Sequence, residues 1–146
     1  MVSIKRIASA FWEGGLKDGT GKVSSTSGVL NETPYNFRMR FENEAGTNPE
    51  ELLASAHAAC FSMALSATFG NYAITPKRID TQATCIMEPI KAGGFKIARM
   101  VLDVKADVPG LEKEMFDQII READKGCPVS NLLRSGLEIE LKAHLL

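Results

Sequence analysis

Two of the three cysteines in this 146-residue chain lie where a thiol could react as well as pack. Cys60 falls in the middle of a predicted helix, among small and apolar neighbours. Cys127 lies between Gly126, which ends one predicted helix, and Pro128, which begins the next. Because the thiolate is the nucleophilic form of cysteine, the reactivity of each thiol depends on what would ionise it. We interpret the two thiols as a reacting pair.

The two positions favour ionisation to different degrees. Cys127, as the residue before a helix, faces unsatisfied backbone N–H groups that lower a thiol pKa, although a small packed capping residue is the simpler interpretation. Cys60 is about three turns into its helix, where apolar burial raises the pKa and leaves an inert, structural cysteine. To react, Cys60 therefore needs a cation from another element, and an arginine is the natural choice.

Arg40 and Glu50 are the candidates for this task. Each has an ordinary interpretation, as a solvent-facing arginine and as a first-turn helix acid, but an acid that orients an arginine also aims its charge. Glu50 and Cys60 are ten residues apart, roughly 15 Å along a straight helix. Either Arg40 bridges this gap, or Glu50 approaches Cys60 from a second copy of the chain. We expect an intertwined homodimer with composite sites, and leave open whether Arg40 acts within one chain.

Other reactive side chains give weaker patterns. His57 lies one turn before Cys60, but no acylation motif surrounds it, so a packed histidine is favoured over a protease-type Cys–His pair. Cys85 is interpreted as a small buried hydrophobe on a strand. A zinc site built from Cys60, Cys127 and His57 would lack Cys-x₂-Cys spacing, and we expect no metal or other cofactor.

The elements that must position these residues alternate between strands and helices. Asn48, Pro49 and Glu51 form a helix start with a capping-box pattern, and the helix should run to Phe69 and be buried on most sides. The expected strands are Ser3–Trp12, Lys22–Ser27, Tyr35–Phe41, Arg78–Met87, Phe95–Val108 and Leu137–Leu145; two further helices are expected over Leu111–Lys125 and from Pro128 to Arg134. This order predicts an α+β fold, a long buried central helix on an antiparallel sheet, in a single domain over residues 1–146.

Composition excludes several classes of protein. The chain is 45% hydrophobic and 24% charged, with a net charge of −1 and an isoelectric point near 6.1, so it is globular without a basic surface for nucleic acid or anionic membranes. It shows neither a signal peptide nor 18 consecutive apolar residues, so a soluble, cytoplasmic location is expected. Thiols are kept reduced there, and an odd number of cysteines favours catalysis or redox sensing over a disulfide framework.

Several segments together resemble the OsmC/Ohr family of thiol-dependent peroxidases, and more closely its OsmC (osmotically inducible protein C) branch. They are Ser27–Asn31, Arg40–Glu42, Gly46–Leu52, Ala56–Leu65 and Gly126–Ser130, and the similarity extends from about Trp12 to the C-terminus. The resemblance implies an α+β homodimer that reduces organic hydroperoxides, and hydrogen peroxide less well.

The same resemblance implies a role for each of four residues. Cys60 resembles the peroxidatic cysteine and Cys127 the resolving one, while Arg40 and Glu50 match the pair that activates the thiolate. An external dithiol would restore both thiols. Helix position alone favours Cys127 as the more acidic thiol, so we expect Arg40 to outweigh that effect at Cys60.

Two alternative functions keep the thiol pair without peroxide turnover. The first is a redox sensor, although the chain has no DNA-reading element to transmit a signal. The second is a module that binds an apolar ligand between helices, with Cys60 incidental. For a peroxidase, we expect Leu52, Leu53, Phe61 and Met63 to line an apolar approach for the organic group.

Overall fold

The computed structural model describes residues 2–136 and 138–146. Contacts within the chain fall into two compact units, Met1–Leu52 and Leu53–Leu146. Leu137, predicted as the first residue of the last strand, lies outside the described residues. The organisation of the whole chain as one domain stays a prediction.

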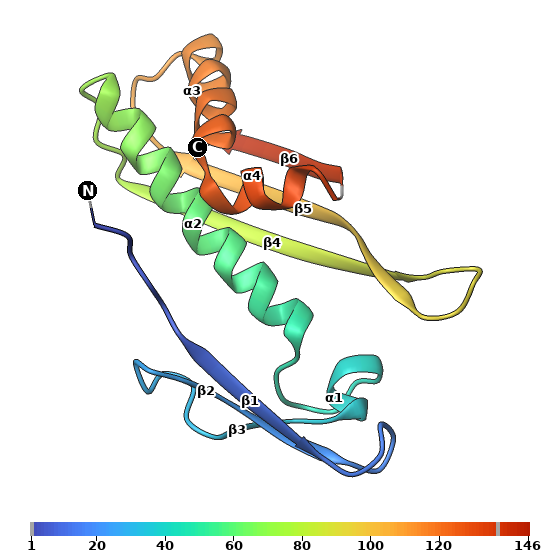
Figure 1. Ribbon diagram of the computed structural model, residues 1–146. Coiled ribbons are helices and arrows are strands. Elements are labelled where there is room, and N and C mark those ends of the chain that lie inside the picture. The colour runs from blue at the N-terminus through green and yellow to red at the C-terminus, as the bar shows by residue number, and fades with distance from the viewer. Residues whose placement is uncertain (1, 137) are drawn as a thin grey trace. The chain divides into compact units, whose positions relative to one another are not determined.

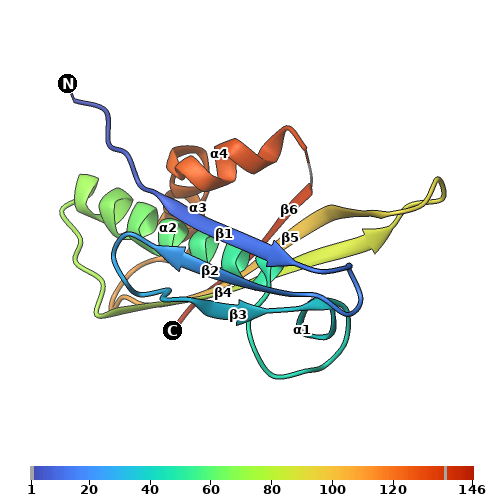
Figure 2. The same cartoon turned by 60° about the horizontal axis from the view of Figure 1, so that its bottom comes forward.

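The first unit contains a three-stranded antiparallel sheet in the order β1–β2–β3. Its strands are β1 (Ala8–Glu13), β2 (Thr20–Ser25) and β3 (Thr33–Tyr35), which lie side by side in Figure 2. Gly21 of the middle strand pairs with both Trp12 and Tyr35. A side chain at Gly21 would collide with both rings, so glycine there lets the two rings approach to 5.5 Å between centroids.

The predicted strand over Tyr35–Phe41 is wrong, because the chain turns into a short helix, α1 (Phe37–Phe41). Asn36 begins this helix, and its side-chain oxygen accepts a hydrogen bond from the Met39 N–H at 2.8 Å. Asparagine competes in this way with strand pairing for the backbone donors. Phe37 and Phe41, expected on one face of a strand, instead meet one helical turn apart with 4.8 Å between ring centroids.

The long central helix, α2 (Pro49–Asn71), begins where the sequence predicts. The side-chain oxygen of Asn48 accepts a hydrogen bond from the Glu51 N–H at 2.8 Å, which satisfies one free donor of the first turn. Glu50 and Glu51 lie at the positive end of the helix, where their charges are favourable.

The second unit is built on the sheet β4–β5–β6, with α2, α3 and α4 on one face of it (Figure 1). The elements are β4 (Arg78–Pro89), β5 (Phe95–Asp107), α3 (Lys113–Gly126), α4 (Pro128–Arg134) and β6 (Glu138–Leu145). β4 and β5 are antiparallel, but β5 and β6 are parallel, so the prediction of a purely antiparallel sheet is wrong. The helices α3 and α4 make the crossover that a parallel pair requires.

The core of this unit lies between the sheet and the helices. Its fully buried apolar side chains come from α2, from alternate positions of β5 and from α3: Phe61, Leu65 and Phe69; Leu102, Val104 and Ala106; Phe116, Ile119 and Ala123. Each large side chain buried here stabilises the unit by about 1.5–3 kcal/mol. Cys127 belongs to the same core and is itself fully buried.

Only one face of α2 is buried within the chain, so the prediction of a helix covered on most sides is not met by one copy. Met63 on the opposite face is 76% exposed. α2 is 23 residues long with a mean hydropathy of 1.4 over 18 residues, of which 28% are buried, so by length and composition alone it could cross a membrane. Core helices of soluble proteins meet the same criterion, and Phe61, Leu65 and Phe69 of α2 lie in a protein core.

Candidate active site

Arg40 and Glu50 form a tight ion pair in the first unit. The Arg40 Nε donates hydrogen bonds to both carboxylate oxygens of Glu50 at 3.2 Å, and Nη2 donates to Oε1 at 2.7 Å. Two parallel donors fix the orientation of the guanidinium as well as its position. Among the described residues, Nη1 of Arg40 makes no hydrogen bond, and 38% of the Arg40 side chain remains exposed against 11% for Glu50. The guanidinium is therefore both held and available to a further group.

Asn48 holds the two elements that carry this pair. Its side-chain oxygen caps α2 through Glu51, while its Nδ2 donates to the Met39 carbonyl of α1 at 3.1 Å. The Asn48 amide thus links α1, which carries Arg40, to the first turn of α2, which carries Glu50. The sequence predicts the capping bond, but no local sequence pattern predicts the bond to Met39.

The two predicted thiols lie together in the second unit. Cys60 on α2 and Cys127 before α4 have their sulfur atoms 3.5 Å apart, and both are free thiols. A disulfide has an S–S length of about 2.05 Å, so closing the bond requires an approach of about 1.5 Å. The structure thus brings the four predicted site residues together as two pairs, one in each unit.

The surroundings of Cys60 oppose its ionisation. Burial raises the pKa of the Cys60 thiol, a hydrogen bond from the Val129 backbone N–H acts in the opposite direction, and the neighbouring Cys127 raises the pKa further. The raised pKa agrees with the expectation that ionisation of Cys60 needs a cation from another element. Cys127 caps α4 as predicted, with its sulfur accepting from the Ser130 N–H at 3.5 Å.

His57 is fully buried and bonded to Ser130. Its Nε2 lies 2.8 Å from the Ser130 hydroxyl oxygen, so it is not paired with Cys60 as a protease-type site would require. Burial lowers the pKa of His57, which keeps the ring neutral near pH 7. Val129 and Ser130 were not predicted as contacts of the thiols. Both lie in the first turn after Cys127, within the segment Gly126–Ser130 that resembles the family.

The remaining candidates are the third cysteine and a metal site. Cys85 lies half-buried on β4, opposite Met100 of β5. Among residues 2–136 and 138–146, no group of three or more histidine, cysteine or acidic side chains has the arrangement of a metal site.

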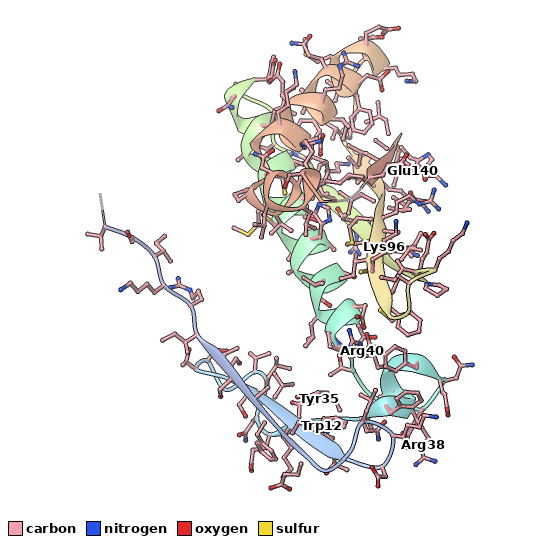
Figure 3. The ribbon with its side chains drawn as sticks, turned by 45° about the vertical axis from the view of Figure 1, so that its right-hand side comes forward. Trp12, Tyr35, Arg38, Arg40, Lys96 and Glu140 are labelled. Carbon is pink, nitrogen blue, oxygen red and sulfur yellow. The ribbon has the colours of Figure 1, made fainter. Side chains whose placement is uncertain are left out.

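An apolar cavity of about 470 Å³ lies beside Arg40 in the first unit. Figure 3 labels Trp12, Tyr35 and Arg40 among the side chains around it. The remaining lining is Gly14, Leu16, Asn36, Phe37, Phe41 and Pro49. The expected lining by Phe61 is wrong, because that side chain is fully buried in the core of the second unit.

Comparisons with known proteins identify the family of the chain. Residues 41–142 match the family model described as OsmC-like protein. The chain is 48% identical to Peroxiredoxin OsmC of Escherichia coli (strain K12), over 95% of this chain and 96% of that protein. The chain belongs to the OsmC family. It is also 31% identical to the organic hydroperoxide resistance protein OhrB of Bacillus subtilis (strain 168), over 84% of this chain and 88% of that one.

Solved structures agree with the fold of this OsmC-family chain. An organic hydroperoxide resistance protein from Elizabethkingia anophelis superposes with a TM-score of 0.75 at 28% identity, covering 100% of both chains. OhrB of Bacillus subtilis superposes with a TM-score of 0.70 at 25% identity, covering 94% of this chain and 97% of that one. The predicted family is confirmed, and the names of its members agree with the prediction of a thiol-dependent peroxidase.

Proposed function

We propose that this OsmC-family protein is a cysteine-based peroxidase that reduces organic hydroperoxides, and hydrogen peroxide less well, to alcohols or water. The observation that carries the proposal is the 3.5 Å separation of the Cys60 and Cys127 sulfurs from two different elements. A thiol pair at this distance can cycle between dithiol and disulfide with little movement. The names of the relatives supply the substrate class.

The reaction runs in three balanced steps. The Cys60 thiolate attacks the terminal oxygen of the hydroperoxide, the O–O bond breaks, and the leaving alkoxide takes a proton to become the alcohol. Cys60 is thereby oxidised to a sulfenic acid. Cys127 then attacks that sulfur, the S–S bond forms, and the hydroxyl leaves with the Cys127 proton as water. An external dithiol reduces the disulfide and is itself oxidised.

Arg40 supplies the cation that the surroundings of Cys60 lack. Burial raises the pKa of Cys60, so a thiolate needs a nearby positive charge. The guanidinium of Arg40, oriented by Glu50, has Nη1 available to contact the thiolate and later the peroxide oxygens. The apolar cavity beside Arg40 suits an organic group better than hydrogen peroxide, which has nothing apolar to place there.

A homodimer with composite sites is part of the proposal. α2 leaves an apolar face exposed in one copy, and a second α2 would cover it. Whether Arg40 and Glu50 act on the thiol of their own chain or of the second copy, both thiols of one site come from one chain. We also propose that the chain forms a single domain and works in the cytoplasm, where dithiol reductants keep thiols reduced.

Turnover of tert-butyl hydroperoxide with excess dithiol tests the proposal. The wild type should consume many equivalents of peroxide. Cys60→Ser should lose all activity, and Cys127→Ser should react once and then over-oxidise at Cys60. Normal cycling by Cys127→Ser would contradict the two-cysteine scheme. Consumption of only one equivalent by the wild type would instead favour a redox sensor, which has the same thiol pair.

A further inference from the structure

His57 is a buried titratable group that the peroxidase steps do not use. It is fully buried on the face of α2 that also carries Cys60 one turn later, and its Nε2 bonds the Ser130 hydroxyl at 2.8 Å. Ser130 is also fully buried. Residues 57 and 130 are 73 positions apart, so this bond fastens α2 directly to α4.

The same first turn of α4 contacts both reacting sulfurs. The Ser130 backbone N–H donates to the Cys127 sulfur at 3.5 Å, and the Val129 backbone N–H donates to the Cys60 sulfur. The Ser130 side chain therefore anchors to α2 the segment whose backbone holds the two thiols. If this anchor is removed, the first turn of α4 and Cys127 with it can move relative to Cys60.

We propose that His57 and Ser130 are a positioning pair for the resolving step, which keep Cys127 within reach of Cys60 once Cys60 is a sulfenic acid. This inference rests on the proposed peroxidase function and assigns a part of it to residues that touch neither peroxide nor sulfur through their side chains. In the step itself, the Cys127 sulfur bonds to the Cys60 sulfur and the S–O bond breaks. His57 and Ser130 exchange no atoms or electrons with either sulfur.

The sulfenic acid at Cys60 has two competing fates. Attack by Cys127 is unimolecular and depends on how well the two sulfurs are held together, whereas a second hydroperoxide attacks in a bimolecular step and yields the sulfinic acid. Looser positioning of the two sulfurs slows only the attack by Cys127. The ratio of disulfide to sulfinic acid at a given peroxide concentration therefore reports positioning, and a merely structural role would not change it.

A role for His57 as the cation at Cys60 does not fit the same geometry. Its Nε2 is engaged by Ser130, and its Nδ1 makes no hydrogen bond to any described residue. Burial lowers the pKa of His57, and of the charged groups that act on it, Asp124 on α3 raises that pKa and Arg134 on α4 lowers it. A neutral imidazole does not stabilise a thiolate by charge.

Two substitutions remove the bond from opposite sides. Ser130→Ala deletes the hydroxyl but keeps the backbone N–H that contacts Cys127, and His57→Leu deletes the ring nitrogen. We expect disulfide formation slowed about tenfold, the rate equivalent of one buried hydrogen bond, and sulfenic acid formation slowed less, because it loses only part of the Val129 N–H contact to Cys60. The double variant should be no slower than either single variant. His57→Gln, whose amide can still reach Ser130, should restore much of the rate.

Ser62→Ala is the matched control. Its hydroxyl bonds the Ala58 carbonyl of α2 and Thr81 of β4 at 2.7 Å, and no hydrogen bond joins it to a described residue of α4. It should lower the melting temperature about as much as Ser130→Ala does and leave the disulfide-to-sulfinic ratio unchanged.

Stopped-flow kinetics with one equivalent of hydroperoxide, followed by mass spectrometry of Cys60, gives the rates of sulfenic acid and disulfide formation. Disulfide formation at wild-type rate in either folded variant, Ser130→Ala or His57→Leu, would overturn the inference and leave the peroxidase intact. If both variants are unstable, wild-type resolution in His57→Asn, whose amide is too short for Ser130, overturns it equally. Absence of any sulfenic acid in the wild type would instead reject the peroxidase function itself.

Discussion

Cys60 combines a position that disfavours charge with a proposed reaction that requires it. Burial and Cys127 raise the pKa of its thiol, and the Val129 N–H offsets only part of this. The guanidinium of Arg40 is fixed by two parallel hydrogen bonds from Nε and Nη2 to Glu50, which suits it to stabilise a thiolate without reorganisation. The proposed activation of Cys60 therefore depends on Arg40.

Arg40→Met should raise the pKa of Cys60 and slow its reaction with hydroperoxide near pH 7 by about tenfold for each unit of that rise. The rate of Cys60 alkylation against pH, in a Cys127→Ser background, measures this pKa. Arg38→Met is the control, because Arg38 also lies on α1 but pairs with the half-buried Glu44. An unchanged Cys60 titration in Arg40→Met would remove the arginine from the mechanism.

His57 gives the stability a predictable dependence on pH. Burial lowers its pKa in the folded protein below the usual 6.5, so between the two values the unfolded chain binds more protons. The free energy of unfolding that His57 contributes is therefore present above about pH 6.5 and lost as the pH falls below it. Urea unfolding at about pH 7.5 and about pH 5.5 should show a smaller loss for His57→Gln than for the wild type. Equal losses would contradict a buried neutral histidine.

At the scale of elements, the start of α2 and the short helix α1 act as one support for Arg40. Asn48 caps α2 with its oxygen and bonds the Met39 carbonyl of α1 with its nitrogen. Asn48→Ser keeps a good capping acceptor but lacks a side chain long enough to reach Met39. It should leave the melting temperature within a few degrees of wild type and lower kcat/KM several-fold.

Thr47→Ala is the control for this substitution. Thr47 bonds the Glu51 side chain at the same helix start, and its side chain has no hydrogen bond to α1 among the described residues, so its loss should leave kcat/KM unchanged. If Asn48→Ser had wild-type kcat/KM, the bond to Met39 would have no part in positioning Arg40.

Local sequence signals predicted some elements and missed others for identifiable reasons. The Asn48-Pro49 and Cys127-Pro128 starts are chemical signals read within one turn, and both helices begin there. The alternating pattern after Tyr35 indicated a strand, but the Asn36 cap decided the conformation. The parallel direction of β6 depends on the path through α3 and α4, which no residue of β6 records.

The candidate site likewise contains contacts that the sequence predicted and one that it did not. Motif resemblance predicted the two pairs, Arg40 with Glu50 and Cys60 with Cys127, and the structure brings the partners of each pair together. The bond between His57 and Ser130 joins residues 73 positions apart, so only the tertiary fold reveals it.

At the scale of the whole molecule, α2 has more apolar surface than one chain covers. Ala56, Ala59, Met63 and Ala67 share an exposed helical face, opposite the face that carries Phe61 and Leu65. Small residues let two helices approach closely, which suits the proposed crossing of two α2 helices about a two-fold axis.

Met63→Glu should shift the protein from dimer to monomer and abolish most peroxidase activity, because a charge on this face would be buried without a partner. Sedimentation measures the mass. Met115→Glu, at an exposed methionine of α3, is the control and should remain dimeric. A fully active, dimeric Met63→Glu protein would place the dimer interface elsewhere.

The most direct test of the central claim is the identity of the disulfide formed in one turnover. The reduced protein is treated with one equivalent of hydroperoxide without dithiol, and its peptides are mapped by mass spectrometry. We predict one disulfide between Cys60 and Cys127 of the same chain, one equivalent of alcohol, and Cys85 still reduced. Peroxide consumption with Cys60 and Cys127 both still reduced, or a disulfide that includes Cys85, would contradict it.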